Sequence, residues 1–344
     1  MTPPVVISFA DAVAKTAHEK HRHVLLGNGF SRAWRDDIFS YSALLDQAAS
    51  KGLSPDARSV FDKLNTTDFE TVMRALRDAA IIVGHYTQGA SPLTQQLEAD
   101  AASLREILVQ AIAGNHPARL TEITQSEFAH ARTFLAHFER TYTVNYDLLL
   151  YWTFMQAEIE PVLQPDDGFR TPDDGPCEYV TWGIENSNKQ NTFYLHGALH
   201  LFDAGHELKK YTWSNTGIAL MDQVRSALIA GLFPIFVSEG TSEQKLGRIK
   251  HSDFLSRGYR SFANIGGCLF IHGHSMSPQD EHITSLIETN KVHTLAVGLR
   301  TPLSASSLLI CERCEGLVTA RAGTRHPLVV MYYDAASAAV WRAA

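Results

Sequence analysis

The sequence lacks several features that would place it in a class at once. It has no stretch of about 18 consecutive apolar residues, the length that crosses a membrane, and Asp11 interrupts the first apolar run where a signal peptide would continue. It also lacks an excess of basic residues: 30 Lys and Arg stand against 37 Asp and Glu, a formal charge of -7. General nucleic-acid binders are normally basic. We therefore expect a soluble, cytoplasmic protein without membrane contact, and direct nucleic-acid contact is disfavoured.

Cysteine is scarce as well. The four cysteines of this 344-residue chain are Cys177, Cys268, Cys311 and Cys314, too few and too scattered for a disulfide framework. Only Cys311 and Cys314 are close in sequence, and one such pair makes a poor zinc site without two further ligands, for instance His326. We expect no bound metal. The composition, 45% hydrophobic and 19% charged, is ample for a packed core.

The charge is distributed unevenly. Residues 156–185 hold eight acids and one base, so the remainder of the chain is balanced and the argument against nucleic acid weakens. Within this stretch QPDDGFRTPDDGP is typical of a solvated surface turn, and a loop folding over a ligand is the alternative. A modest group of bases later in the chain is either plain surface or a contact for nucleic acid or an acidic partner: Lys245, Arg248, Lys250, Arg257 and Arg260.

Short runs of branched and aromatic residues predict strands at 23–27, 140–144, 192–196, 232–237, 268–273 and 293–298. Each run is nearly all apolar, as in strands that are covered on both faces. Helix-compatible stretches follow at 147–158, 216–230, 241–263 and 279–290. This alternation predicts an α/β fold with a doubly wound, mostly parallel sheet. Residues 314–341 indicate short terminal strands, with turns at Gly323 and at Asp334 and Ala335.

The interval 42–139 has a different pattern, because its apolar residues recur at helical spacing. We predict that it is a helical insert in a Rossmann-like domain formed by residues 1–41 and 140–344. One predicted helix carries Asp68, Glu70, Arg74 and Arg77. Thr67 or Asp68 can cap this helix while the others form a solvated face. Alternatively the insert is a lid or an interaction block, with an acid or arginine pointing into a ligand cleft.

Polar motifs follow the predicted strands. The first strand leads into a glycine-containing loop, Gly27, Asn28, Gly29, Phe30 and Ser31. A glycine pair here lets the backbone turn tightly and approach a phosphate, although the third glycine of the dinucleotide fingerprint is absent and a simple tight turn is the alternative. Asn145 and Asp147 follow the second strand, at the crevice where parallel sheets bind ligands or as helix caps.

Histidine ends a further strand. His196 precedes Gly197 and is placed to act as a base in the same crevice, or else it is a hydrogen-bonded core residue. Similar polar loops occupy residues 238–242 and 273–277. Five such motifs at strand ends favour one shared ligand crevice over five independent caps.

The order of these motifs resembles the sirtuin-like superfamily: GNGFS, TVNYD, LHG, a Glu-Gly loop and GHSMSPQDEHI, over residues 23 to 299 apart from the insert. In detail the chain is similar to a bacterial branch long catalogued as a domain of unknown function, and to NAD-consuming effectors of antiphage defence. The resemblance implies that Asn145 holds the nicotinamide ribose or the attacking water and that His196 is the catalytic histidine. It also implies an NAD-binding set: Gly27, Asn28, Gly29, Phe30, Ser31, Asp147, Gly197, Glu239, Gly273, Ser275 and Asp280.

One departure from the sirtuin pattern limits which reaction is expected. Sirtuin deacylases carry zinc-binding cysteines soon after the His-Gly pair, whereas residues 198–267 contain none. The resemblance thus implies an NAD⁺ glycohydrolase of antiviral defence, with NAD as substrate. An ADP-ribosyltransferase or deacylase, and a non-catalytic subunit that senses NAD or ADP-ribose, are the alternatives. Because an unrestrained NADase kills its host, we expect control by homo-oligomerisation or by a partner such as an ATPase or nuclease.

Overall fold

A computed structural model describes residues 4–87, 91–172, 178–205, 207–212, 216–238 and 241–342. At its centre is a seven-stranded sheet whose paired strands all run parallel. The predicted α/β class is therefore confirmed, and the arrangement is consistent with a Rossmann-like fold. The strands lie in the order β1 (Val6–Ile7), β12 (Val329–Asp334), β11 (Lys291–Leu299), β10 (Gly266–His272), β2 (Arg22–Leu26), β3 (Arg140–Thr143) and β6 (Thr192–Tyr194).

Helices cover both faces of this sheet. Val24 and Leu26 of β2 face a core shared with α1 (Phe9–Lys15) and α8 (Gln125–Leu135). Leu25 between them faces a second core, built with α13 (Asp253–Ala263), α15 (Leu286–Thr289) and α16 (Ala305–Arg321). Burial on both faces is the physical reason for the nearly continuous apolar runs in these strands.

A second, antiparallel sheet was not predicted. Its strands lie in the order β4 (Phe169–Arg170), β5 (Tyr179–Trp182), β8 (Leu208–Tyr211), β7 (Gly197–Asp203) and β9 (Pro234–Phe236). The strand predicted at 232–237 was assigned to the wrong sheet, because β9 pairs with β7. Gly197 starts β7 directly after β6 with a φ of +86°, and a Cβ there would lie 2.0 Å from the carbonyl oxygen of Ile235. The chain can therefore change sheets here only through glycine.

Part of the acidic stretch is folded into this second sheet. Asp166 pairs with Arg170 at 2.6 Å, and Asp167 with the buried Lys210 at 2.6 Å. These two acids are thus structural partners rather than a solvated turn. Residues 173–177, which include Cys177, lie outside the described residues.

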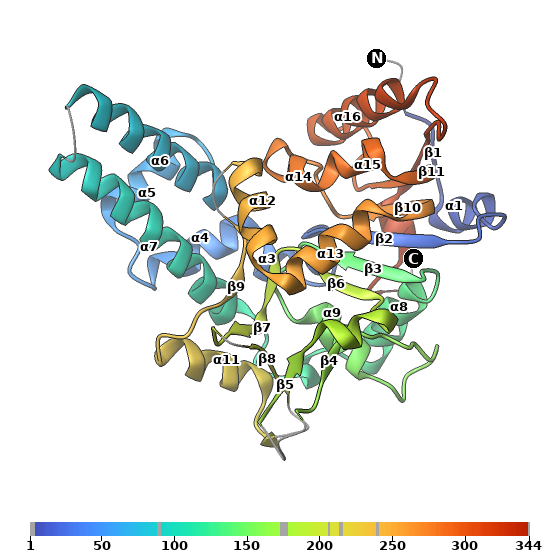
Figure 1. Cartoon of the computed structure of the whole chain (residues 1–344), viewed down its shortest axis with the longest axis horizontal. Helices are drawn as coiled ribbons and strands as arrows, with labels where there is room; N and C mark the ends of the chain where they lie inside the picture. Colours follow the sequence, from blue (N-terminus) through green and yellow to red (C-terminus); the bar gives the residue numbers. More distant parts are fainter. Residues whose placement is uncertain are drawn as a thin grey trace.

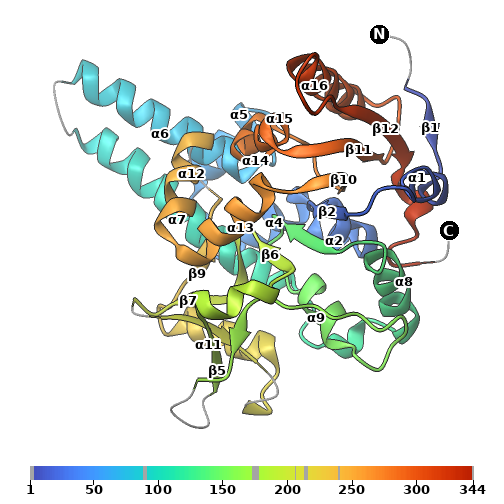
Figure 2. The ribbon, with the colours of Figure 1, turned by 45° about the vertical axis from the view of Figure 1, so that its right-hand side comes forward.

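The predicted insert contains α4 (Tyr41–Ala49), α5 (Pro55–Lys63), α6 (Phe69–Tyr86), α7 (Pro92–Asn115), the 3₁₀ turn η1 (Leu120–Glu122) and α8, which packs on the parallel sheet. Asp68 caps α6, as one alternative predicted, by accepting the amide of Glu70 at 2.9 Å. The helices α6 and α7 lie side by side and extend away from the sheet (Figures 1 and 2). No described helix is long and apolar enough to span a membrane.

The prediction of terminal strands was half wrong. Only β12 is a strand there, since residues 305–321 form α16. Its buried face follows helical spacing through Ser307, Ile310, Cys311, Cys314 and Leu317, but small polar residues hide the apolar stripe. The remaining elements are α2 (Gly29–Trp34), α3 (Asp36–Phe39), α9 (Leu149–Met155), η2 (Ile184–Lys189), α11 (Leu220–Ile229), α12 (Ser242–His251), η3 (Pro278–Asp280), α14 (Glu281–Thr284) and η4 (Ala335–Ala338).

Candidate active site

The strand register brings four of the sequence motifs to one edge of the parallel sheet. His272 of β10 pairs with Leu26 of β2, Leu26 with Thr143 of β3, and Thr143 with Tyr194 of β6. Parallel strands end at the same edge, so the residues two positions further on follow one another across it. They are His274, Asn28, Asn145 and His196.

Two of these loops contact each other through their backbones. The amide of Gly27 donates to the His272 carbonyl at 3.0 Å and that of Gly29 to the Gly273 carbonyl at 2.8 Å. A Cβ on Gly273, whose φ is +69°, would lie 2.5 Å from the Cα of Gly29. Loop-to-loop packing therefore requires these glycines. The Phe30 and Ser31 amides also donate to backbone carbonyls within the loop, so the loop is held closed by its own hydrogen bonds.

Asn145 is fixed on one side of its carboxamide only. Its Nδ2 donates to the Gly27 carbonyl at 3.0 Å and to Ser31 Oγ at 3.2 Å. The Oδ1 atom is buried and accepts no hydrogen bond from any described residue. A buried acceptor without a partner costs free energy, and such groups are rare in folded proteins. The loop thus holds one hydrogen-bond acceptor ready for a group that the protein does not supply.

Asp147 has two structural partners. Its Oδ2 accepts from Ser31 Oγ at 2.6 Å, and its Oδ1 accepts the Leu149 amide at 2.9 Å. The second bond satisfies the first free amide of α9, as one alternative predicted, and Leu148 is the N-cap residue. Burial raises the pKa of Asp147 even though Ser31 and the Leu149 amide stabilise its charge. Asp147 therefore sets the position of Ser31, which in turn orients Asn145.

His196 contacts a histidine that the sequence analysis did not single out. Its Nε2 lies 3.0 Å from Nε2 of His282, and the two rings stack at 21°. The other nitrogen of His282 lies 3.3 Å from Ser242 Oγ at the start of α12. Burial lowers the pKa of His196 well below its usual value and that of His282 to about 4. Both rings are therefore neutral near pH 7, and one Nε2–H donates to the other ring.

Asp280 lies at the centre of the charged groups. Its carboxylate lies 3.1 Å from Lys245 Nζ, 3.2 Å from His274 Nε2 and 3.9 Å from His196 Nε2. The Nδ1 of His274 accepts the Met276 amide, so Nε2 carries the ring proton; Nε2 lies near Asp280 but makes no hydrogen bond of good geometry to it. Although burial opposes it, His274 and Lys245 hold the pKa of Asp280 well below its ordinary value. Asp280 is therefore ionised.

Lys245 joins this cluster to the helical insert. Its side chain is fully buried, and Nζ lies 2.6 Å from Oε2 of Glu70 in the first turn of α6. The interpretation of Lys245 as basic surface is wrong, because its charge is paired inside the protein. One acid of the insert does point inward. Burial raises the pKa of Glu70, and the Lys245 ammonium 2.6 Å away opposes this shift.

Two other residues implied by the resemblance, Phe30 and Ser275, lie apart from this cluster. Phe30 is buried against Trp341, whose Nε1 donates to its carbonyl at 2.7 Å, so its ring is part of the core. Ser275 is exposed, and its carbonyl accepts from Arg313 of α16 at 3.1 Å. Asp280 faces the histidines rather than Ser275, and Glu239 lies outside the described residues.

The cysteines of α16 do not form a metal site with His326. Cys311 and Cys314 are free and buried, and Cys314 Sγ lies 3.9 Å from Met276 Sδ. His326 instead lies beside His293, with ring nitrogens 3.3 Å apart.

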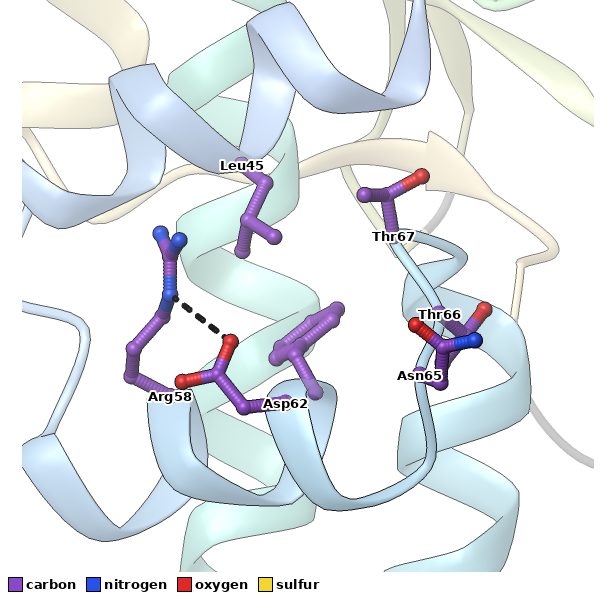
Figure 3. A pocket seen from close by; sticks show the side chains of 7 residues that line it. Leu45, Arg58, Asp62, Asn65, Thr66 and Thr67 are labelled. Atoms are coloured by element: carbon purple, nitrogen blue, oxygen red, sulfur yellow. Dashed lines mark ion pairs between the residues drawn. The ribbon is translucent and has the colours of Figure 1, made fainter.

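A cavity of about 380 Å³ lies away from these residues, between α4, α5 and the loop that precedes α6 (Figure 3). Its walls include Leu45, the Arg58 and Asp62 pair at 3.8 Å, and residues 65–67. None of the predicted site residues lines it. Residues 65–67 lead directly into Asp68, the N-cap of α6, and Glu70 lies in the first turn of that helix. The cavity is therefore next to the start of α6.

A family model described as "Domain of unknown function (DUF4917)" matches residues 24–341. The chain belongs to this family. No curated protein matches the chain. The region matched by the DUF4917 model contains the whole of the α6–α7 hairpin and all residues of the cluster described above. These are Glu70, Asn145, His196, Lys245, His274, Asp280 and His282.

Sequence reasoning missed His282 and Lys245 as members of the cluster, whereas Ser242 lies in a polar loop that was assigned to the shared crevice. His282 lies within the quoted GHSMSPQDEHI motif, so its proximity to His274 and Asp280 could have been a signal. Lys245 lies in a helix that otherwise reads as charged surface, and no local pattern marks it. Only the fold brings it to Glu70, 175 positions away.

Proposed function

We propose that this protein is an NAD⁺ glycohydrolase of the sirtuin-like type, which converts NAD⁺ and water to nicotinamide, ADP-ribose and a proton. The observation that carries the proposal is the Oδ1 of Asn145. This oxygen is a buried acceptor without a hydrogen-bond partner. Asn145 lies two residues beyond Thr143 of β3, and His196 lies two residues beyond Tyr194 of β6, the residue with which Thr143 pairs. The loop that follows β3 also contacts the loop that follows β6, since Tyr146 stacks beside His196 with ring centroids 6.3 Å apart.

The proposed reaction needs little from the protein beyond orientation and one base. Cleavage of the C1′–N bond returns the bonding electrons to the nicotinamide nitrogen, which leaves as a neutral ring. Water adds to the ribose carbon and loses its proton to His196. Asn145 Oδ1 accepts a hydrogen bond from the water or a ribose hydroxyl and so fixes the direction of attack. Such proton transfer typically contributes about 10²–10⁴-fold to the rate.

The acids of the cluster are less buried than its histidines and Asn145. His196, Asn145 and His282 are buried, whereas Glu70 and Asp280 keep 16% of their side-chain area exposed. We propose that a ligand approaches from this side, past the contact between Glu70 and Lys245. A ligand that enters there meets the insert first, which fits the expectation that the insert controls the site.

The experiment is to incubate the pure protein with NAD⁺ and to follow nicotinamide and ADP-ribose by chromatography. We expect equal amounts of both products, and at least a hundredfold slower release for Asn145→Ala. The matched control is Asn264→Ala, an exposed asparagine whose Nδ2 bonds only to the Arg260 carbonyl. It should hydrolyse NAD⁺ like the wild type.

The other outcomes each assign a different function. Nicotinamide release with the ADP-ribose label retained on macromolecules would identify a transferase. NAD⁺ or ADP-ribose binding without turnover, with or without candidate partner proteins, would identify a sensing subunit. Hydrolysis that persists in Asn145→Ala would contradict the proposed role of this carboxamide. The setting we propose for the hydrolase is antiviral defence in bacteria, tested by the survival of phage-infected cells that carry wild-type or variant protein.

A further inference from the structure

His196, His282 and Asp280 present three metal-ligating atoms to one point. The donor atoms of these side chains all lie within 4.8 Å of one another, and among the described residues no other set of three histidine, cysteine or acidic side chains does so. The two Nε2 atoms are 3.0 Å apart, and His196 Nε2 is 3.9 Å from Asp280 Oδ1. Two nitrogens on one ion with bonds of about 2.0–2.1 Å are themselves about 2.9–3.4 Å apart.

We propose that this triad binds a divalent transition-metal ion, with zinc as the representative. Two imidazoles and one carboxylate are the donor set of zinc, cobalt, nickel and ferrous sites, whereas magnesium and calcium prefer oxygen ligands. Three protein ligands leave further coordination positions for water or a ligand. The sequence alone predicted no metal, because His282 was not recognised as part of the site.

The surroundings of the triad suit this role. A metal-bound histidine usually hydrogen-bonds through its second nitrogen, and Nδ1 of His282 lies 3.3 Å from Ser242 Oγ. In the ion-free protein one Nε2–H lies between the two rings. Binding requires that this ring carry its proton on Nδ1 instead, so both Nε2 lone pairs become available without any change in charge. Lys245, 3.1 Å from Asp280 Oδ1, competes with the ion for one carboxylate oxygen.

Metal binding has a consequence that rests on the proposed function. An ion held by Nε2 of His196 withdraws electron density from the ring and so weakens His196 as a base toward water. The triad would then act as an inhibitory site, and the hydrolase would be active only without the ion. Asn145 is not a ligand, so NAD binding and metal binding can be measured separately.

The test uses the full chain, freed of metal with a chelator and then dialysed. Zn²⁺ binding is measured by calorimetry, and Co²⁺ is added as a spectroscopic probe of nitrogen and oxygen coordination. We expect one ion per chain. His282→Ala should weaken the affinity at least a hundredfold. Ser242→Ala, which removes only the partner of a ligand, should weaken it about 10–100-fold while the thermal unfolding midpoint stays near that of the wild type.

The control removes the exposed histidine pair that could also attract zinc. His326→Ala breaks the contact with His293 and should leave the stoichiometry and affinity unchanged. Failure to bind zinc at micromolar concentrations, or binding that is lost in His326→Ala but retained in His282→Ala, would overturn the proposal. Zinc binding with no NAD⁺ hydrolysis under any condition would overturn the proposed function alone. Hydrolysis without zinc binding would overturn only the metal site.

Discussion

Both edges of the parallel sheet carry histidines, but the two edges differ in what surrounds them. At the amino edge His23 is buried beside His21, and His21 pairs with Glu139 at 2.5 Å where both side chains are 46% exposed. At the carboxyl edge His196 meets Asp280 of η3 and His282 of α14, which contact α12, and Lys245 of α12 in turn contacts α6. Convergence of several elements, rather than the presence of histidine, distinguishes the candidate site. The comparison can be tested with matched changes at the two edges.

The largest difference should be catalytic. His196→Gln removes the proposed base, and we expect NAD⁺ hydrolysis to fall by about 10²–10⁴-fold. His23→Gln changes a histidine that is equally buried in the same sheet, and it should leave the rate within about twofold. The measurement is initial nicotinamide release by proteins whose unfolding midpoints are matched. Equal losses in both variants would show that the rate reports fold integrity rather than a site.

The next difference concerns charge. Lys245→Met leaves Glu70 and Asp280 without their cation inside the protein, and breaking such a buried pair costs about 3–5 kcal/mol. At the amino edge Glu139→Gln removes one partner of an exposed pair, which is worth about 0–1 kcal/mol. Denaturant titration of both variants gives the two free energies of unfolding. A loss below about 1 kcal/mol for Lys245→Met would mean that α6 is not held by this ion pair.

Each edge also has a glycine that cannot carry a Cβ. Gly273→Ala would meet the Cα of Gly29 at 2.5 Å, and Gly267→Ala would meet the His21 carbonyl oxygen at 2.4 Å, both at positive φ. Strain and overpacking together should cost about 2–4 kcal/mol at either position. Only Gly273→Ala should also slow NAD⁺ hydrolysis by the folded protein, because Gly267 lies at the opposite edge of the sheet. Gly323→Ala has positive φ in open space and should cost about 1 kcal/mol.

The last expected difference is in the pH dependence of stability. Burial lowers the pKa of His23 from 6.5 to about 4, with Glu139 opposing the shift and Arg140 and His21 adding to it. The unfolded chain takes up a proton at higher pH than the folded chain does, so stability falls as the pH falls. We expect His23 to contribute a loss of about 2 kcal/mol between pH 7 and pH 5. Urea unfolding of wild type and His23→Gln isolates this contribution as a difference.

The parallel sheet could be predicted from sequence because strands that are buried on both faces are nearly all apolar, and this pattern is visible in each strand by itself. Its strand ends could be predicted for the same reason, which is how Asn145 and His196 were found. The second sheet could not, because one glycine, Gly197, turns the chain from β6 into β7. The cluster itself could not either. Glu70, Lys245 and His282 lie far apart in the chain, and no local pattern marks a long-range contact.

The contact between Glu70 and Lys245 bears on how the chain can be dissected. A shortened protein without the α6–α7 hairpin would keep both sheets, yet it would also keep an ammonium group in its interior with only Asp280 to balance it. Such a truncation would expose or disorder the start of α12, including Ser242. The hairpin is therefore not a detachable module: engineered minimal versions need Lys245 replaced at the same time, and chain-length variants should tolerate change at the far end of the hairpin rather than at its base.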